Sequence, residues 1–182
     1  MIMQKSAKCR RRIVVISGLV ALVTCSLLAC APAPAPTPSP TPAFASEEAA
    51  FAAAEEVYRA YNDAGNARRL DRAGASPQQY LVGAALEADI EAQSLLSASG
   101  VRIEGEASVI SVSGRSAKFE GQQATLVLVL CLDVSHVLVR NEDGADVTPP
   151  ERGDLVAQEV TFIGTKQSLL IANEASLDVS TC

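Results

Sequence analysis

The sequence contains one segment, Thr125-Leu-Val-Leu-Val-Leu-Cys-Leu132, in which apolar side chains occupy both faces of an extended chain. Strands of this kind lie at the centre of a sheet, because both of their faces are covered. Residues 117–140 continue the pattern as one unusually long strand, and the preceding Ser113-Gly-Arg115 is typical of a turn. The middle of a β-sheet is therefore predicted in the second half of the chain.

Three further strands are predicted from apolar residues that recur with a period of two. They cover residues 101–112, with a bulge expected at Gly105, and residues 155–163 and 168–177. Asn141-Glu-Asp-Gly144 is typical of a hairpin turn. Short connections of this kind imply antiparallel pairing.

The first half of the chain is predicted to be helical. Ser46 is a suitable N-cap, Glu47 and Glu48 follow where the helix dipole favours negative charge, and Gly65 is the expected stop. Two shorter helices are predicted over residues 76–82 and 84–98, the second with Leu86, Ile90 and Leu95 or Leu96 facing inward.

Helices that precede the strands, instead of alternating with them, indicate an α+β architecture. We therefore expect a single α+β domain over residues 44–182. Its N-terminal helices should pack on a strongly bent antiparallel sheet of about four strands, the arrangement of a cone fold.

The first 30 residues are typical of a secretory signal: five basic residues, the apolar run 13–29, and then a cysteine. Leu27-Leu-Ala-Cys30 resembles the lipobox of bacterial lipoproteins. That resemblance implies a signal peptide over residues 1–29 and a lipid anchor on Cys30, at the outer face of the bacterial cytoplasmic membrane. The alternatives are secretion without lipid and an uncleaved anchor, since the 17 residues of the run are near the shortest span of a bilayer.

Residues 30–43 are predicted to form a spacer. Proline alternates with small residues from Ala31 to Pro42, so every second amide lacks a hydrogen and neither helix nor sheet can form. In polyproline II conformation this arm spans roughly 35–40 Å, at about 3.1 Å per residue.

Removing residues 1–29 makes the remaining chain strongly acidic. Five basic residues and no acidic ones are lost, so 15 Lys and Arg against 21 Asp and Glu become 10 against 21, and the net charge falls from −6 to about −11. Such a surface is a poor partner for nucleic acid and for anionic lipid. The partner expected from the signal is the membrane, through lipidated Cys30.

Two cysteines remain after the lipidated one, Cys131 and Cys182. Outside the cytoplasm they can pair, and a closed loop of about 50 residues would stabilise the fold by roughly 4 kcal/mol. We expect the intramolecular disulfide. Two free thiols, or a Cys182 paired with another molecule, are the alternatives.

The segment Phe51-Ala-Ala-Ala-Glu-Glu-Val-Tyr-Arg-Ala-Tyr61 resembles the first helix of the nuclear-transport-factor-2-like (ketosteroid-isomerase-like) family. The chain also resembles actinobacterial lipoproteins that carry such a domain, through residues 131–135, 146–150 and 159–164. The resemblance implies a cone whose open end is a ligand pocket. Its members include isomerases, cyclases, dehydratases, transport factors and domains without chemistry.

Five side chains are candidates for such a pocket, with Asp133, His136 and Tyr58 as the weak catalytic candidates; the others are Tyr61 and Tyr80. His136 is the only histidine, and on the predicted long strand it faces away from Asp133, so the two cannot act as a pair. Structural roles are favoured for all three: a core tyrosine, a hydrogen-bonding aspartate and a surface histidine.

No metal site and no cofactor are expected, because one histidine and committed cysteines leave no ligand set and no phosphate-binding motif is present.

We expect a non-enzymatic module in the cell envelope that binds a protein or a small apolar ligand. The alternative is a small-molecule isomerase or dehydratase that uses the pocket. A dimer is compatible with either function, and the sequence leaves the oligomeric state open.

Overall fold

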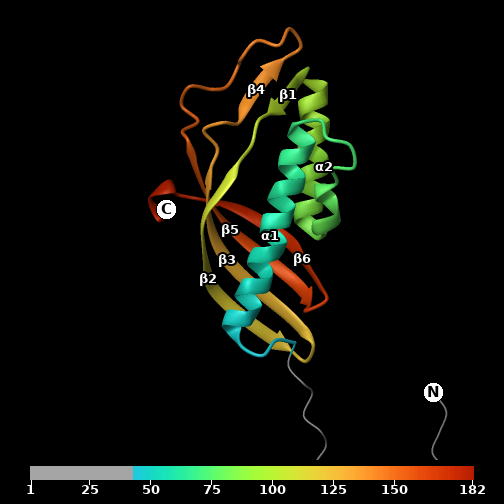
Figure 1. The fold of residues 1–182 in the computed structure, drawn as a ribbon, viewed down its shortest axis with the longest axis vertical. Helices are drawn as coiled ribbons and strands as arrows, with labels where there is room; N and C mark the ends of the chain where they lie inside the picture. Colours follow the sequence, from blue (N-terminus) through green and yellow to red (C-terminus); the bar gives the residue numbers. More distant parts are fainter. Residues whose placement is uncertain (1–42) are drawn as a thin grey trace, which may run out of the picture. The chain divides into compact units, whose positions relative to one another are not determined.

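A computed structural model describes residues 43–182 (Figure 1). The expectations for the signal peptide, Cys30 and the Pro-rich spacer lie outside the described residues. No helix within residues 43–182 is long and apolar enough to cross a membrane.

The described residues form two α-helices, six strands and two short 3-10 helices (Figure 1). In chain order they are α1 (Glu47–Arg69), η1 (Pro77–Tyr80), α2 (Gly83–Ala98), β1 (Val101–Glu104), β2 (Ser108–Glu120), β3 (Gln123–Asp133), β4 (Leu138–Asn141), β5 (Leu155–Thr165), β6 (Ser168–Leu177) and η2 (Val179–Thr181). A four-stranded antiparallel sheet has the order β2-β3-β5-β6, and β1 and β4 form a separate antiparallel pair. The expected α+β fold, with helices packed on an antiparallel sheet, is confirmed.

Strand β3 lies in the middle of the sheet, between β2 and β5, as its sequence predicts. Leu126, Leu128 and Leu130 are fully buried on the face that α1 covers, and they meet Val160 and Phe162 of β5 there. Because both neighbours of β3 are hydrogen-bonded to it, its backbone needs no contact with solvent. This strand and the buried face of α1 make up most of the core.

The predicted turn at Ser113-Gly-Arg115 and the predicted long strand over residues 117–140 are wrong. Strand β2 runs through Gly114, and the chain reverses at Gly121, whose φ of +63° suits glycine. Gly114 is needed instead for close packing, since a Cβ atom there would overlap the ring of Phe51 on α1. A glycine that a turn would explain locally thus serves a contact with a distant helix.

Helix α1 begins where expected and continues beyond its predicted end. The Ser46 hydroxyl accepts a hydrogen bond from the Ala49 amide at 3.2 Å, and Glu47 and Glu48 lie in the first turn. Gly65 is buried inside the helix, which ends at Arg69. A glycine inside a helix costs about 1 kcal/mol, and the contacts of the following turn with the rest of the domain offset it.

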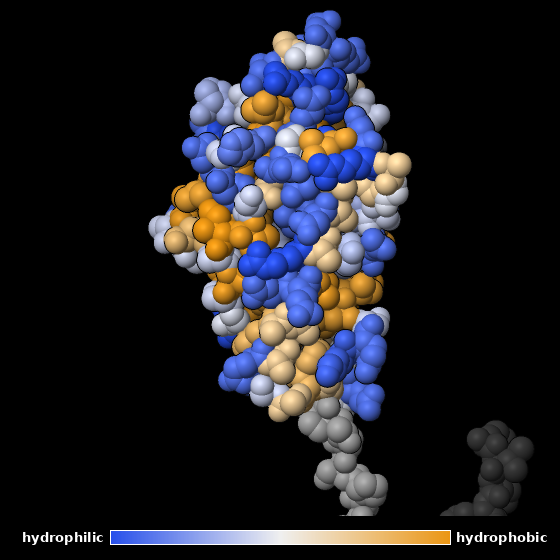
Figure 2. All heavy atoms as spheres, viewed as in Figure 1, coloured by the Kyte–Doolittle hydropathy of each residue, from blue (hydrophilic) through white to orange (hydrophobic). Residues whose placement is uncertain are grey.

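Helix α2 buries fewer of its apolar side chains than its sequence predicts. Ile90 and Leu95, two of the residues predicted to face inward, are 52% and 60% exposed, while Leu86 and Leu96 are half-buried. On the face seen in Figure 2, apolar residues appear as separate patches between polar ones. Scattered exposure of this kind is ordinary for a protein surface.

The predicted strand over residues 101–112 is divided between the two sheets. β1 ends at Glu104 and pairs with β4, whereas β2 begins at Ser108 and pairs with β3. Residues 105–107, which link β1 to β2, belong to neither sheet. Their backbone is hydrogen-bonded instead to the side chains of Asn66 and Arg69 on α1.

Cys131 of β3 and Cys182 form the expected disulfide, with 5.6 Å between their Cα atoms and a sequence separation of 51. Cys131 points away from Leu130 and Leu132, to the face of the sheet opposite α1. The disulfide therefore attaches η2 and the last described residue to the outer face of the central strand.

Candidate functional site

A cavity of about 250 Å³ lies between the C-terminal half of α1 and the inner face of the sheet. One wall is apolar and comes from β1, β3, β5 and the segments after β1 and β3: Ile103, Ala107, Leu132, Val134, Val137 and Val156. The polar wall comes mainly from α1, with one residue of β5: Tyr58, Tyr61, Asn62, Arg68, Arg69 and Gln158. An apolar cavity with a few polar groups is the usual composition of a small-molecule site.

The two tyrosines of α1 are fixed by residues of the neighbouring strands. The Tyr58 hydroxyl donates to Gln158 Oε1 at 2.8 Å, and the Tyr61 hydroxyl donates to Glu174 Oε2 on β6 at 3.2 Å. Their rings meet edge to face, with centroids 5.7 Å apart. Both rings are therefore held in place before any ligand arrives.

Burial keeps these tyrosines neutral. Burial, followed by the nearby charge of Glu174, raises the pKa of Tyr58 and the pKa of Tyr61 well above their ordinary value. Burial is also the largest cause that raises the pKa of Glu174, against the hydrogen bond from Tyr61. Near neutral pH the tyrosines stay protonated and cannot act as bases. Because each hydroxyl proton is already donated to Gln158 or Glu174, the hydroxyl oxygens can only accept a hydrogen bond from a ligand.

Arg68 is neutralised by an ion pair with α2. Its guanidinium donates two hydrogen bonds to Asp89, at 2.7 and 3.0 Å, and Gln78 donates a third to the same carboxylate at 3.0 Å. Burial opposes ionisation of Asp89, but these hydrogen bonds outweigh it and lower the pKa of that carboxyl. The bidentate pair connects the two helices at the edge of the cavity.

The last two turns of α1 hold the backbone that links β1 to β2. The Asn66 amide both accepts from the Ala107 nitrogen at 2.8 Å and donates to the Ala107 oxygen at 3.0 Å, while Asn62 donates to the same oxygen at 3.0 Å. Arg69 Nε donates to the Gly105 oxygen at 3.2 Å, and Arg69 Nη2 donates to Asn66 Oδ1. Residues 105–107 are thus fixed as one side of the cavity.

Among the predicted candidates, only Tyr58 and Tyr61 line this cavity. Tyr80 lies in η1, half-buried. Asp133 ends β3, and its carboxylate accepts from the Ser135 amide at 2.8 Å. Interactions with the Ser135 side chain first and with this amide second lower the pKa of Asp133. This is the geometry of an aspartate that stabilises a turn.

His136 does not lie on a strand, contrary to its predicted place. It is exposed in the turn between β3 and β4, where its Nδ1 lies 3.2 Å from the Ser135 hydroxyl. Strand β3 ends at Asp133, where the chain turns toward β4, which pairs with β1. The predicted alternation of side chains between the two faces of a strand therefore does not apply to His136.

Six polar residues that line or support the cavity were not predicted from the sequence: Asn62, Asn66, Arg68, Arg69, Gln158 and Glu174. A signal existed for one of them, because Gln158 shares its strand face with Val156, Val160 and Phe162. A polar residue on an otherwise apolar face is the informative exception in a buried strand. The other five had no local signal, since each contacts a group of another element that is far away in the sequence.

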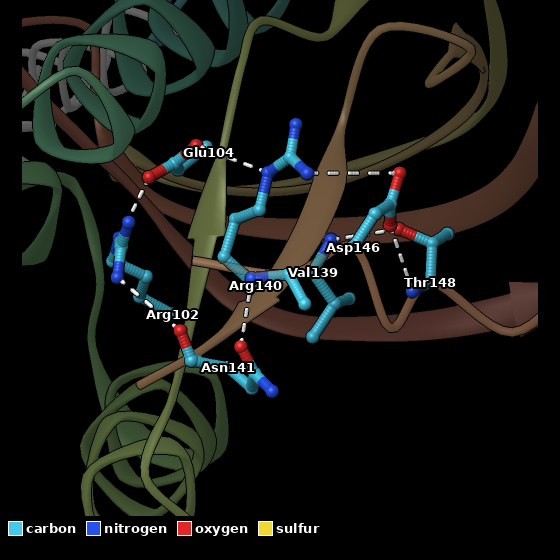
Figure 3. Close-up of polar contacts among 8 residues, drawn as sticks. Arg102, Glu104, Val139, Arg140, Asn141, Asp146 and Thr148 are labelled. Atoms are coloured by element: carbon cyan, nitrogen blue, oxygen red, sulfur yellow. Dashed lines mark hydrogen bonds and ion pairs between the residues drawn. The ribbon is translucent and has the colours of Figure 1, made fainter. Parts of the chain in front are cut away.

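A second polar cluster lies on the β1–β4 pair (Figure 3). Glu104 lies 2.6 Å from Arg102 Nε and 3.5 Å from Arg140 Nε, and Arg140 Nη1 lies 4.0 Å from Asp146. Each charge in it has an opposite partner, which is what a solvated ion-pair network requires. In residues 43–182 no group of His, Cys, Asp and Glu is arranged to hold a metal ion.

No protein-family model and no curated protein matches the chain. A solved structure, that of the intermembrane space region of the chloroplast protein ARC6, is similar at 13% sequence identity with a TM-score of 0.48. The alignment covers 70% of this chain and 95% of that one.

Proposed function

We propose that this chain is an extracytoplasmic lipoprotein whose domain binds a small molecule in the cavity between α1 and the sheet, without chemical conversion. The membrane partner is the lipid bilayer, reached through Cys30. The Pro-rich arm holds the domain away from the lipid surface. The support for the location is the signal-like N-terminal sequence. The acidic charge of the remaining chain disfavours attachment to anionic lipid through the protein surface, so the proposal assigns the attachment to Cys30.

The composition of the cavity wall is the observation that favours binding over catalysis. In the part of the chain that the structure describes, the residues lining the cavity include no Asp, Glu or His. General acid–base catalysis needs a group whose pKa lies near the working pH. The two tyrosines are far from that condition, because burial raises the pKa of each.

Among the carboxylates near the cavity, Glu174 has a raised pKa, as a catalytic base often does. Its position argues against that role. Its pKa is raised by burial, yet it accepts a hydrogen bond from Tyr61 and does not line the cavity. An isomerase or dehydratase would need such a group to reach the ligand itself. Binding therefore has better support than the enzymatic alternative.

Native mass spectrometry of the lipidated full chain, extracted from the membranes of the cells that make it, tests the binding function. We expect a small molecule bound to each chain and released with its mass unchanged after incubation. Val137→Trp should remove it, because the larger side chain fills the cavity. Val129→Trp is the matched control, since Val129 is also half-buried but belongs to the opposite face of the sheet.

Two results would contradict the proposal. A ligand that is converted to a product of different mass during incubation would identify an enzyme. A bound molecule that persists in Val137→Trp, or the lack of any bound molecule in the wild type, would rule out this cavity as the site. The location is tested separately: Cys30→Ala should leave no lipidated chain in the membrane.

A further inference from the structure

We propose that the ligand is a small amphipathic carboxylate, with its carboxylate at Arg69 and its aliphatic body on the opposite apolar wall. This inference rests on the proposed binding function and specifies the class of ligand. It starts from an arginine whose charge no carboxylate of the domain neutralises.

Arg69 differs from most arginines of the described domain. Six others each have a carboxylate oxygen at 4.0 Å or closer: Arg59, Arg68, Arg72, Arg102, Arg115 and Arg140. Among residues 43–182, Arg69 has no such partner, although it is partly buried in the cavity wall. A partly buried cation without a counterion is unfavourable, and a bound anion removes that cost.

The guanidinium is fixed and still has donors to offer. Nε and one nitrogen of the fork are used by Gly105 and Asn66, and Asn66 is itself held by Ala107 on both of its amide atoms. The structure assigns no partner within residues 43–182 to Nη1. A Cβ atom on Gly65 would lie 3.5 Å from Nη1 of Arg69. Arg69 Nη1 therefore lies beside the turn of α1 that contains Gly65, a residue that lines the cavity. A rigid fork of this kind suits a carboxylate.

The nearby charges do not replace an external anion. Arg68 also lines the cavity, but Asp89 neutralises it; Glu106 pairs with Arg72 at 3.6 Å. Burial, followed by the Arg68 charge, lowers the pKa of Arg69, which is the expected sign for a cation that lacks a partner. The hydroxyl of Tyr58 and the amide of Asn62 belong to the same wall as Arg69.

The remaining walls set the size and the polarity of the ligand. Facing the polar wall are aliphatic side chains, including Ile103, Leu132 and Val156. A volume of about 250 Å³ is slightly below the usual range of ligand pockets, roughly 300–1,000 Å³. Since acidic residues outnumber basic ones by 21 to 10 in residues 30–182, long-range repulsion disfavours polyanions. A short or branched monocarboxylate satisfies all three conditions.

The test uses the lipidated full chain in nanodiscs and octanoate as the probe, with binding followed by saturation-transfer NMR. Octan-1-ol and octylamine present the same aliphatic body with a neutral and a cationic head, and empty nanodiscs correct for partition into lipid. We expect octanoate to bind about ten- to a hundredfold more tightly than octan-1-ol, because a charged hydrogen bond is lost in the alcohol. Octylamine should bind more weakly still.

Variants then locate the carboxylate. Arg69→Gln should weaken octanoate binding about tenfold or more and leave octan-1-ol binding nearly unchanged, while Arg69→Lys should recover part of the loss. Arg152→Gln is the matched control, an arginine that also lacks a carboxylate partner in the described residues but does not line the cavity. Unfolding midpoints without ligand show whether each variant is folded, and the comparison of the three probes on the wild type needs no variant.

The outcomes separate this inference from the proposed function. Equal binding of octanoate and octan-1-ol, or unchanged octanoate binding by a folded Arg69→Gln, overturns the carboxylate. If no probe binds while Val137→Trp still removes a co-purified molecule, the carboxylate is wrong and the binding function stands. If no probe binds and no molecule is removed, both are wrong.

Discussion

The side-chain amide of Asn66 is hydrogen-bonded to both backbone atoms of Ala107, accepting from its nitrogen at 2.8 Å and donating to its oxygen at 3.0 Å. The amide thus pairs with the chain as a neighbouring strand would. It connects the last two turns of α1 to the segment between β1 and β2. This contact explains both why α1 continues past Gly65 and why the predicted strand over residues 101–112 is divided.

Replacing Asn66 should therefore weaken the whole domain. We expect Asn66→Ala to lower the free energy of unfolding by about 1–3 kcal/mol, because Ala107 loses a buried partner for its nitrogen. Asn62→Ala is the control: it removes one hydrogen bond to the Ala107 oxygen, which Asn66 still satisfies. Urea unfolding measures both, and equal small effects would contradict the role given to Asn66.

The contact between Gly114 and Phe51 gives a second expectation. Gly114→Ala places a Cβ atom closer to one edge of the Phe51 ring than van der Waals contact allows. It should destabilise the domain by about 1–3 kcal/mol, the usual range for overpacking. Phe51→Leu provides space, so the double variant should be more stable than the sum of the single effects predicts. A double-mutant cycle in urea tests this, and additive effects would show that the two residues do not compete for the same volume.

The disulfide should contribute strongly to stability. Removing both sulfurs, as Cys131→Ala with Cys182→Ala, should lower the free energy of unfolding by roughly 4 kcal/mol on the chain-entropy model for a loop of this length. Intact mass without reductant first verifies the bond in the wild type. The wild type treated with reductant should approach the double variant, and a reductant-insensitive wild type would contradict a stabilising disulfide.

Glu174 should make stability depend on pH in a defined direction. Burial raises the pKa of Glu174 in the folded domain, so the unfolded chain releases this proton at a lower pH than the folded domain does. The wild type therefore loses stability as the pH rises from about 4.5 through the folded-state pKa of Glu174. Glu174→Gln keeps an acceptor for Tyr61 without the charge. It should be more stable than the wild type near neutral pH and lose this advantage in acid.

Urea midpoints between about pH 4 and pH 7 test the expectation for Glu174. Glu87→Gln is the control, since Glu87 is an exposed residue of α2 that makes no ion pair among the described residues. A constant difference between Glu174→Gln and the wild type over this range would contradict a shifted carboxyl.

Elements defined by neighbours in the sequence were predicted well. The Ser46 cap and its two glutamates identify the start of α1, and the two-sided apolar pattern around Leu128 identifies the central strand. Both depend on interactions within a few residues. The pairing of Cys131 with Cys182 was also expected, because they are the two cysteines outside the predicted signal peptide and the predicted lipid site.

Elements that depend on distant contacts were predicted less well. Ser113-Gly-Arg115 has the composition of a turn, but Gly114 is small because Phe51 packs against it. Ile90 and Leu95 continue the apolar spacing of α2, yet nothing in the domain covers them fully. Local composition does not contain the information about which surfaces meet.

By itself, the sequence determined the α+β class with helices before strands, the central strand and the cysteine pair. Only the tertiary structure decided which polar groups surround the cavity, since Tyr58 and Gln158 are 100 residues apart and Tyr61 and Glu174 are 113 apart. The physical reason is that helix and strand periodicity arise from neighbouring residues. The meeting of distant side chains depends on sheet register and helix placement, which the packing of the whole core determines.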